Sequence, residues 1–165
     1  MPRISADEAG GKNVCAFLDA IAVSELGEAL LASSDDGYNV IVGSTASFPD
    51  LFDSYGQHPN KLVNLAKLGI ASTAAGRYQE LYRYWVVYQH QLGLADFSPI
   101  SQDRVAIQQI KERRAFNLIQ AGHFDEAVAA VKNIWASLPG AGYGQHENQL
   151  DALRAAYVSA GGVIA

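Results

Sequence analysis

The sequence predicts an α+β fold in which a mostly helical body carries one small β segment. Apolar residues recur at helical spacing over much of the chain, and turn-forming residues separate these stretches. The strand-like stretch "YNVIVG" at 38–43, with "STASF" behind it as a hairpin partner, follows the first predicted helix. Because strands and helices do not alternate along the chain, we expect segregated α and β parts rather than a layered α/β sheet.

The chain length and its turn signals set the expected domain and element boundaries. At 165 residues the chain can bury one sizeable core and is short for two domains. We expect a flexible N-terminal segment over 1–11 and a single domain over 12–165. Ser98 is the predicted N-cap of a helix that has Pro99 at its first position. The other helices are predicted over 12–31, 61–67, 72–92, 115–122, 125–138 and 146–160.

Composition and motifs argue against several classes of protein. The net charge of −5 makes general nucleic-acid affinity improbable, because phosphate binding needs clustered Lys and Arg. The histidines are scattered, and "HENQL" has no second histidine where a zinc-peptidase helix needs one, so we expect no metal. "GAGYGQ" at 140–145 follows a predicted helix and lacks the third glycine of a dinucleotide loop. The lone Cys15 permits no internal disulfide and is expected in the core, as are Trp85 and Trp135.

Glu25 lies near the middle of an otherwise apolar helical face that includes Leu18 and Ile21. A charge there costs free energy unless it is paired, kept protonated or open to a cleft. One hypothesis pairs Glu25 with Arg77 or Arg104 inside the core. The other makes it a carboxylic acid whose pKa is raised by apolar walls, so that it can donate a proton near neutral pH. Beside a small β lobe, such an acid suits cleavage of a glycosidic bond.

Longer blocks of sequence, which keep their order from about residue 14 to 162, point to a known family. They are "AFLDAIAVSE" at 16–25, "GYNVIVG" at 37–43, "STAAGRYQ" at 72–79, "QLGLADFSPISQDRVAIQQIKER" at 91–113 and "NIWASLPGAGYGQ" at 133–145. In these blocks the chain resembles the bacteriophage lambda-type endolysins, the lytic murein transglycosylases of phage lysis. It departs from the family pattern at Leu26, which stands before Gly27, and we therefore expect the loop after Glu25 to have its own shape.

The resemblance implies a lysozyme-like fold with a saccharide cleft between the helical body and the β segment. It implies that Glu25 is the catalytic acid, and that "GRYQ" and "GAGYGQ" line the cleft. The expected substrate-binding residues are then Tyr78, Gln79, Tyr143 and Gln145. Plain packing is the alternative for both tyrosines. Arg77 is a further candidate, either as a ligand of the lactyl carboxylate of muramic acid or as the partner of an acidic side chain.

The implied reaction is lytic transglycosylation of the bond between N-acetylmuramic acid and N-acetylglucosamine, which leaves a 1,6-anhydro product and needs no cofactor. Hydrolysis is the alternative and requires a second carboxylate, for which Glu28, Asp35 and Asp36 are the candidates. A wall-binding module or helical scaffold without catalysis is a further alternative.

The implied partners and location follow from the same resemblance. We expect a monomer that binds peptidoglycan glycan strands, with no nucleic-acid partner and no stable membrane insertion. The N-terminus carries acids and lacks a long apolar run, so it reads as neither signal peptide nor anchor. Export through a separate holin, from the host cytoplasm to the periplasm and cell wall at lysis, is therefore expected.

Overall fold

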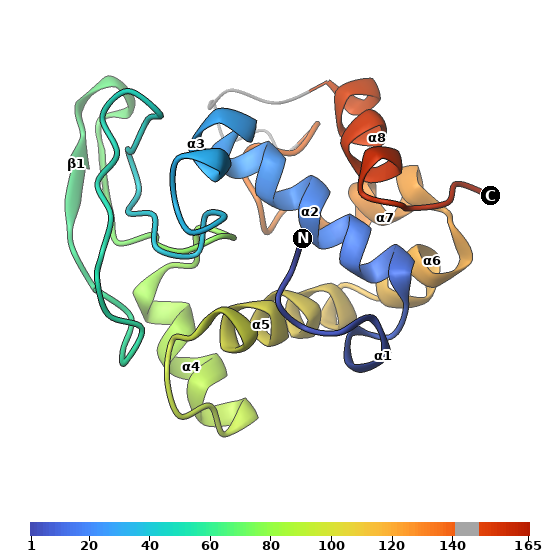
Figure 1. Ribbon diagram of the computed structural model, residues 1–165, viewed down its shortest axis with the longest axis horizontal. Helices are drawn as coiled ribbons and strands as arrows, with labels where there is room; N and C mark the ends of the chain where they lie inside the picture. The colour runs from blue at the N-terminus through green and yellow to red at the C-terminus, as the bar shows by residue number, and fades with distance from the viewer. Residues whose placement is uncertain (141–148) are drawn as a thin grey trace.

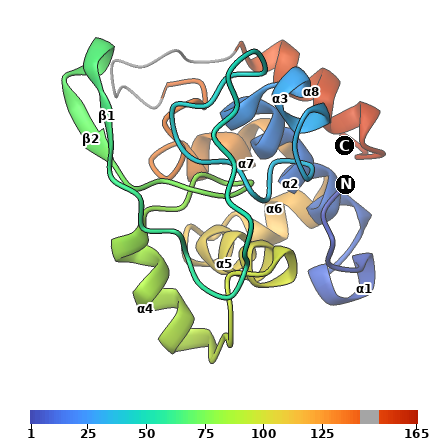
Figure 2. The same cartoon turned by 60° about the vertical axis from the view of Figure 1, so that its left-hand side comes forward.

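A computed structural model, which describes residues 1–140 and 149–165, confirms the α+β fold class (Figure 1). A helical body fills one side of the molecule, and a two-stranded antiparallel sheet stands at the other. Figure 2 shows the sheet above α4 and away from the remaining helices. The helices are α1 (Ala6–Ala9), α2 (Lys12–Leu26), α3 (Glu28–Ala32), α4 (Tyr82–Leu92), α5 (Pro99–Glu112), α6 (Phe116–Ala121), α7 (Phe124–Val131) and α8 (Leu150–Ser159); the strands are β1 (Val63–Leu65) and β2 (Ile70–Ser72), joined by the 3-10 turn η1 (Ala66–Leu68).

Helix α2 crosses the middle of the helical body and forms the centre of its core (Figure 1). It packs against α1, α3, α6 and α8. Phe17, Leu18 and Ile21 are at most 1% exposed, as their helical spacing predicts. A second apolar cluster surrounds Trp85 and Phe97 and joins α4 to α5. The predicted burial of Cys15, Trp85 and Trp135 is confirmed.

The small sheet is where the predicted elements differ most from the structure. Residues 61–67 were expected to be helical, but Val63–Leu65 pairs with Ile70–Ser72, and Leu65 lies opposite Ile70. Gly69, at φ +64°, adopts the left-handed conformation that turns the chain between them. The helix expected from 72 begins only at Tyr82, although it ends before Gly93 as predicted. Pairing between strands, which local spacing does not reveal, outweighs helix propensity here.

The stretch predicted as a strand at 38–43 forms isolated bridges rather than a regular strand. Val40 pairs with Leu51 and Ile41 pairs with Ala75, both antiparallel. The expected hairpin partner at 44–48 closes on itself through a bridge between Thr45 and Phe48. These pairings extend the β region toward the helical body.

The N-terminal segment is folded against the body, in contrast to the flexible lead-in that the sequence suggests. Residues 6–9 form α1, and Ile4 is 5% exposed. The backbone N–H groups of Arg3 and Ile4 both donate to the Asp103 carboxylate, each at 2.8 Å. Because Asp103 is fully buried on α5, it needs such donors, and the segment supplies them.

Several helix boundaries also differ from prediction. The helix expected over 12–31 is divided at Gly27, whose φ of +74° ends α2 and starts α3. The start of α5 at Pro99 after Ser98 and the position of α6 are confirmed. Helix α7 ends at Val131, before the predicted 138, and α8 is described from Leu150. The predicted start at 146 lies outside the described residues. No helix of the described chain is long and apolar enough to cross a membrane.

Candidate active site

Glu25 lies in the last turn of α2, immediately before the helix ends at Gly27. Its side chain is half-buried, and burial raises the pKa of its carboxyl above the ordinary value. The helix terminus acts in the same direction, since the negative end of the helix dipole disfavours an anion. Glu25 is therefore placed to keep its proton at a pH where an exposed glutamate has lost it.

Ser137 is the hydrogen-bond partner of Glu25. Its hydroxyl donates to Oε1 of Glu25 at 2.6 Å, and the Ser24 hydroxyl lies 2.7 Å from the Ser137 hydroxyl. The contact with Ser137 favours the ionised carboxylate and opposes the effect of burial, which is the larger of the two. Glu25 thus has a fixed orientation and an environment that tolerates both protonation states.

A cleft of about 510 Å³ opens beside Glu25, between the small sheet and the segment after α7. The sheet side contributes mainly apolar side chains, of which Leu62 is 68% and Ile70 47% exposed. The described residues that line the cleft are Glu25, Val42, Leu62, Leu65, Ile70, Ala71, Ser72, Thr73, Ala74, Gln79, Leu81, Arg83, Ile134, Trp135 and Ala136. Within this set Glu25 is the single carboxylate, and Arg83 is the single cation.

The carboxylates considered as a second catalytic group lie elsewhere. Glu28 is exposed at the start of α3. Asp35 accepts hydrogen bonds from Arg3 at 2.8 Å and from the Tyr55 hydroxyl at 2.6 Å. Asp36 is paired with Arg77 and with the N-terminal ammonium, and Arg77 holds the pKa of its carboxyl below the ordinary value despite partial burial. None of them lines the cleft.

Arg77 belongs to the core, where it pairs with acidic side chains as the second of its two expected roles has it, and its assignment to the substrate side is corrected. It is 1% exposed and forms ion pairs with Asp19 and Asp36. Its backbone N–H also donates to Oε1 of Gln102 at 3.0 Å. The hypothesis that Glu25 is neutralised by Arg77 is wrong for the same reason, and Arg104 instead lies near Glu8 at 3.8 Å.

Tyr78 is also a core residue, which corrects the expectation that it stands in the saccharide cleft. It is 3% exposed, and its hydroxyl donates to Oδ1 of Asp103 at 2.6 Å. Its carbonyl accepts a hydrogen bond from the indole N–H of Trp135 at 3.2 Å, which ties the segment after α7 to the body. Tyr78 therefore supports the cleft wall from behind.

Gln79 is brought to the cleft wall together with Glu25. Its φ of +50° is uncommon for a residue with a side chain, and its amide donates to the Gly76 carbonyl at 2.9 Å. The tight turn from Ala75 to Glu80 is closed by reciprocal backbone hydrogen bonds between those two residues. Tyr143 and Gln145, the other predicted substrate-binding residues, lie outside the described residues.

Two residues of the site were missed at the sequence level. Ser137 lies within the block "NIWASLPGAGYGQ", but nothing local marks one serine as the partner of a glutamate far away in the chain. Arg83 is exposed at the start of α4 and lines the cleft, and its guanidinium lies over the ring of Tyr84 at 4.7 Å.

Among the described residues, no group of three or more His, Cys, Asp or Glu side chains could hold a metal ion.

A helical body, a small sheet and a cleft with one acidic side chain among its described lining residues define a lysozyme-like protein, and sequence comparison gives its family. A profile of the endolysin family matches residues 15–164, and the chain belongs to this family. It is 48% identical to the endolysin of Escherichia phage P2 over 156 residues, which cover 92% of this chain and 94% of the phage P2 protein. It is 51% identical to the endolysin of Escherichia phage lambda over 150 residues, 90% of this chain and 91% of the relative.

Solved structures agree with the family assignment. The lysozyme of bacteriophage lambda in complex with a chitohexasaccharide superposes with a TM-score of 0.84 at 47% identity, and all of both chains is covered. A second structure of lysozyme from bacteriophage lambda gives a TM-score of 0.82 at 46% identity, again over both whole chains. The chain is thus a lysozyme-like endolysin that acts on peptidoglycan.

Proposed function

We propose that this endolysin cleaves the β-1,4 bond between N-acetylmuramic acid and N-acetylglucosamine by lytic transglycosylation, with Glu25 as the catalytic residue. Glu25 first donates its proton to the glycosidic oxygen as the bond to C1 of the muramic acid breaks. The resulting carboxylate then accepts the proton of the C6 hydroxyl of the same sugar, as that oxygen bonds to C1. The products are a 1,6-anhydro sugar and a new free hydroxyl, Glu25 is reprotonated, and no water is consumed.

The single carboxylate among the described cleft residues is the observation that carries this proposal. Hydrolysis with inversion needs a second carboxylate to activate water, and hydrolysis with retention usually needs one as nucleophile. Transglycosylation replaces both with a hydroxyl that the substrate itself holds beside C1, so that one group can serve as acid and then as base. The raised pKa of Glu25 and its hydrogen bond from Ser137 suit these two roles.

The walls of the cleft fit a polysaccharide. Apolar side chains from the sheet, including Leu62 and Ile70, offer surfaces for the faces of sugar rings, and Gln79 offers an amide for their polar groups. The phage lambda lysozyme, which is similar to this chain over its whole length, has been solved in complex with a chitohexasaccharide, and this supports an oligosaccharide as the ligand of the cleft. Arg83 replaces Arg77 as the candidate to bind the lactyl carboxylate of muramic acid. Tyr143 and Gln145 remain proposed contacts on the strength of the family resemblance.

We also propose that the chain works as a monomer on glycan strands. In this proposal it accumulates in the host cytoplasm and reaches the periplasm and cell wall through a separate holin.

Replacement of Glu25 by Gln tests the assignment of the catalytic residue. The amide keeps the shape of the side chain but has no titratable proton, so we expect turbidity clearing of murein to fall by at least about a thousandfold, since both proton transfers are lost. Murein binding in a pull-down should persist. Glu28→Gln, which removes an exposed carboxylate three residues further along, is the matched control and should clear murein normally. Substantial clearing by Glu25→Gln would place the chemistry on another residue.

A further inference from the structure

Glu80, the last residue of the turn that carries Gln79, forms a pair with Gln109 of α5. The amide Nε2 of Gln109 donates to Oε2 of Glu80 at 2.7 Å. The other side-chain oxygen of each residue, Oε1 of Glu80 and Oε1 of Gln109, is buried and has no hydrogen-bond partner when Glu80 is taken as a carboxylate. Gln109 as a whole is 6% exposed. Two orphaned acceptors on the same two residues are costly, because buried acceptors need donors.

A single proton removes this conflict. A carboxylic acid and a primary amide can pair through two parallel hydrogen bonds, in which the amide N–H donates to one carboxyl oxygen and the carboxyl O–H donates to the amide oxygen. We infer that Glu80 is held as a neutral carboxylic acid that pairs in this way with Gln109, and that this pair positions Gln79 in the wall of the cleft. The inference about Gln79 rests on the function proposed above, whereas the pairing itself does not.

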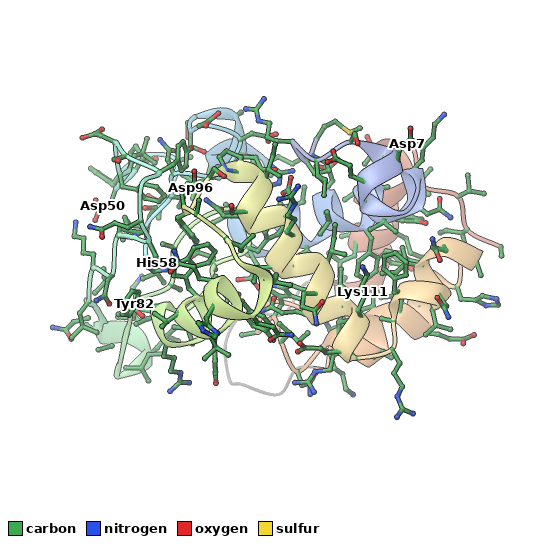
Figure 3. All side chains as sticks on the ribbon, turned by 90° about the horizontal axis from the view of Figure 1, so that it is seen from below. Asp7, Asp50, His58, Tyr82, Asp96 and Lys111 are labelled. Atoms are coloured by element: carbon green, nitrogen blue, oxygen red, sulfur yellow. The ribbon has the colours of Figure 1, made fainter. Side chains whose placement is uncertain are left out.

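The backbone of Glu80 links the pair to the cleft. Its N–H and carbonyl both bond to Ala75, which closes the tight turn. Its carbonyl also accepts from Nε2 of His58 at 2.9 Å, while Nδ1 of His58 accepts from the N–H of Asn60. Figure 3 shows His58 beside Tyr82 at the start of α4, and their rings lie 5.5 Å apart. Gln79, in its left-handed conformation, is therefore followed directly by a residue anchored to α5 and to the loop of His58.

Among the described residues, no charged or titratable side chain forms a hydrogen bond or an ion pair with the Glu80 carboxyl. A pocket of about 220 Å³ beside it is lined by Tyr84 and Tyr88 from α4 and by Glu112 and Arg113 at the end of α5. The Tyr88 hydroxyl donates to Glu112 at 2.8 Å. Burial lowers the pKa of His58, so the imidazole that faces the Glu80 carbonyl is neutral near pH 7. Burial also raises the pKa of the Glu80 carboxyl to about 7, although the hydrogen bond from Gln109 opposes it.

The direction of the expected pH effect follows from these groups. Below about pH 7 Glu80 keeps its proton and both hydrogen bonds form. Above that pH the carboxyl ionises, the bond from its O–H to Gln109 is lost, and a buried charge faces the amide oxygen. The turn from Ala75 to Glu80 then becomes less well ordered. The affinity of the cleft for the sugar therefore falls as the pH rises.

A titration of the side-chain carboxyl carbons of Glu by ¹³C nuclear magnetic resonance tests the pairing. The Glu80 resonance, assigned by its absence in Glu80→Gln, should titrate with a midpoint near the raised value of about 7. Glu126→Gln removes an exposed carboxylate on α7, which does not line this pocket, and should leave that midpoint in place. A Glu80 midpoint below about 5, the range of an ordinary glutamate, would overturn the inference.

Sugar affinity in a Glu25→Gln background tests the positioning role, because that background removes the titration of Glu25. We expect the affinity for a chitooligosaccharide to fall about tenfold between pH 6 and pH 8.5. Adding Glu80→Gln should abolish this fall, since two amides can form the same pair without a titrating proton, and adding Glu80→Ala should weaken binding at both pH values. An equal fall with and without Glu80→Gln would overturn the positioning role. Absence of sugar binding at every pH would instead contradict the proposed function, and the resonance titration would still decide the pairing.

Discussion

At the scale of single residues, Glu25 combines two opposing influences. Burial and the end of α2 favour the neutral acid, whereas the hydrogen bond from Ser137 favours the carboxylate. A group that must first give a proton and then take one back needs both forms to be accessible. The balance between these influences, rather than burial alone, suits Glu25 to its proposed part.

Replacement of Ser137 by Ala tests this balance. Loss of the hydrogen bond removes a contact that favours the carboxylate, so the pKa of Glu25 should rise further above its ordinary value. The alkaline limb of the kcat/KM profile against pH should therefore move to higher pH, with a lower maximum because the carboxylate is a less well oriented base. A limb that moved to lower pH would contradict the role given to Ser137.

At the scale of elements, Glu25 is positioned by the packing of α2 and α3 against the loop that follows α3. Leu26, which departs from the family pattern, is accommodated inside α2, and its side chain packs over Gly37 together with that of Leu31. A Cβ built on Gly37 would lie 2.6 Å from Leu26 and 2.7 Å from Leu31. The absence of a side chain at residue 37 is thus what lets the end of α2 approach the loop.

Substitution of Gly37 by Ala should cost about 3 kcal/mol of unfolding free energy, because a φ of +87° and the clash both oppose it. Activity should fall with it, since the end of α2 must shift. Gly69→Ala is the matched control: φ is +64°, but nothing lies within 4 Å of the added Cβ, so a cost of about 1 kcal/mol is expected. Equal costs in denaturant unfolding would show that the contact with Leu26 and Leu31 is unimportant.

At the scale of the whole molecule, buried polar groups tie distant segments together. Asp103 accepts from the N–H groups of Arg3 and Ile4 and from the hydroxyls of Tyr38 and Tyr78, so one carboxylate on α5 holds the N-terminus, the loop after α3 and the turn behind the cleft. The start of the N-terminal segment that was expected to be flexible is thus held to the body by this residue.

Asp103→Ala should therefore destabilise the protein by about 3–5 kcal/mol, since it leaves several buried donors without an acceptor. For a chain of this size the melting temperature should drop by roughly 10 °C or more. Asp151→Ala is the comparison: that side chain is 89% exposed and paired only at the surface with Arg154, so the change should be small. A small effect of Asp103→Ala in thermal unfolding would refute the anchoring role.

What the sequence could predict follows from how local each feature is. Glu25 was identifiable because a charge on an apolar helical face is visible within a single helix, and the start of α5 because Ser98 and Pro99 are adjacent. The sheet was not, since the pairing of Val63 with Ser72 competes with local propensity. The position of Arg77 depends on Asp19 and Asp36, which lie 58 and 41 residues away. Contacts between residues so far apart in the sequence determine which side chains reach the cleft, but they produce no periodic pattern in the sequence.

The most direct test of the central claim is digestion of purified murein in water labelled with oxygen-18, followed by mass analysis of the muropeptides. Transglycosylation by Glu25 predicts 1,6-anhydro products that contain no label, because the oxygen bonded to C1 comes from the C6 hydroxyl of the sugar. Reducing ends that carry one labelled oxygen would show that water attacks C1, and would contradict the proposal that one carboxylate and the substrate's own hydroxyl suffice.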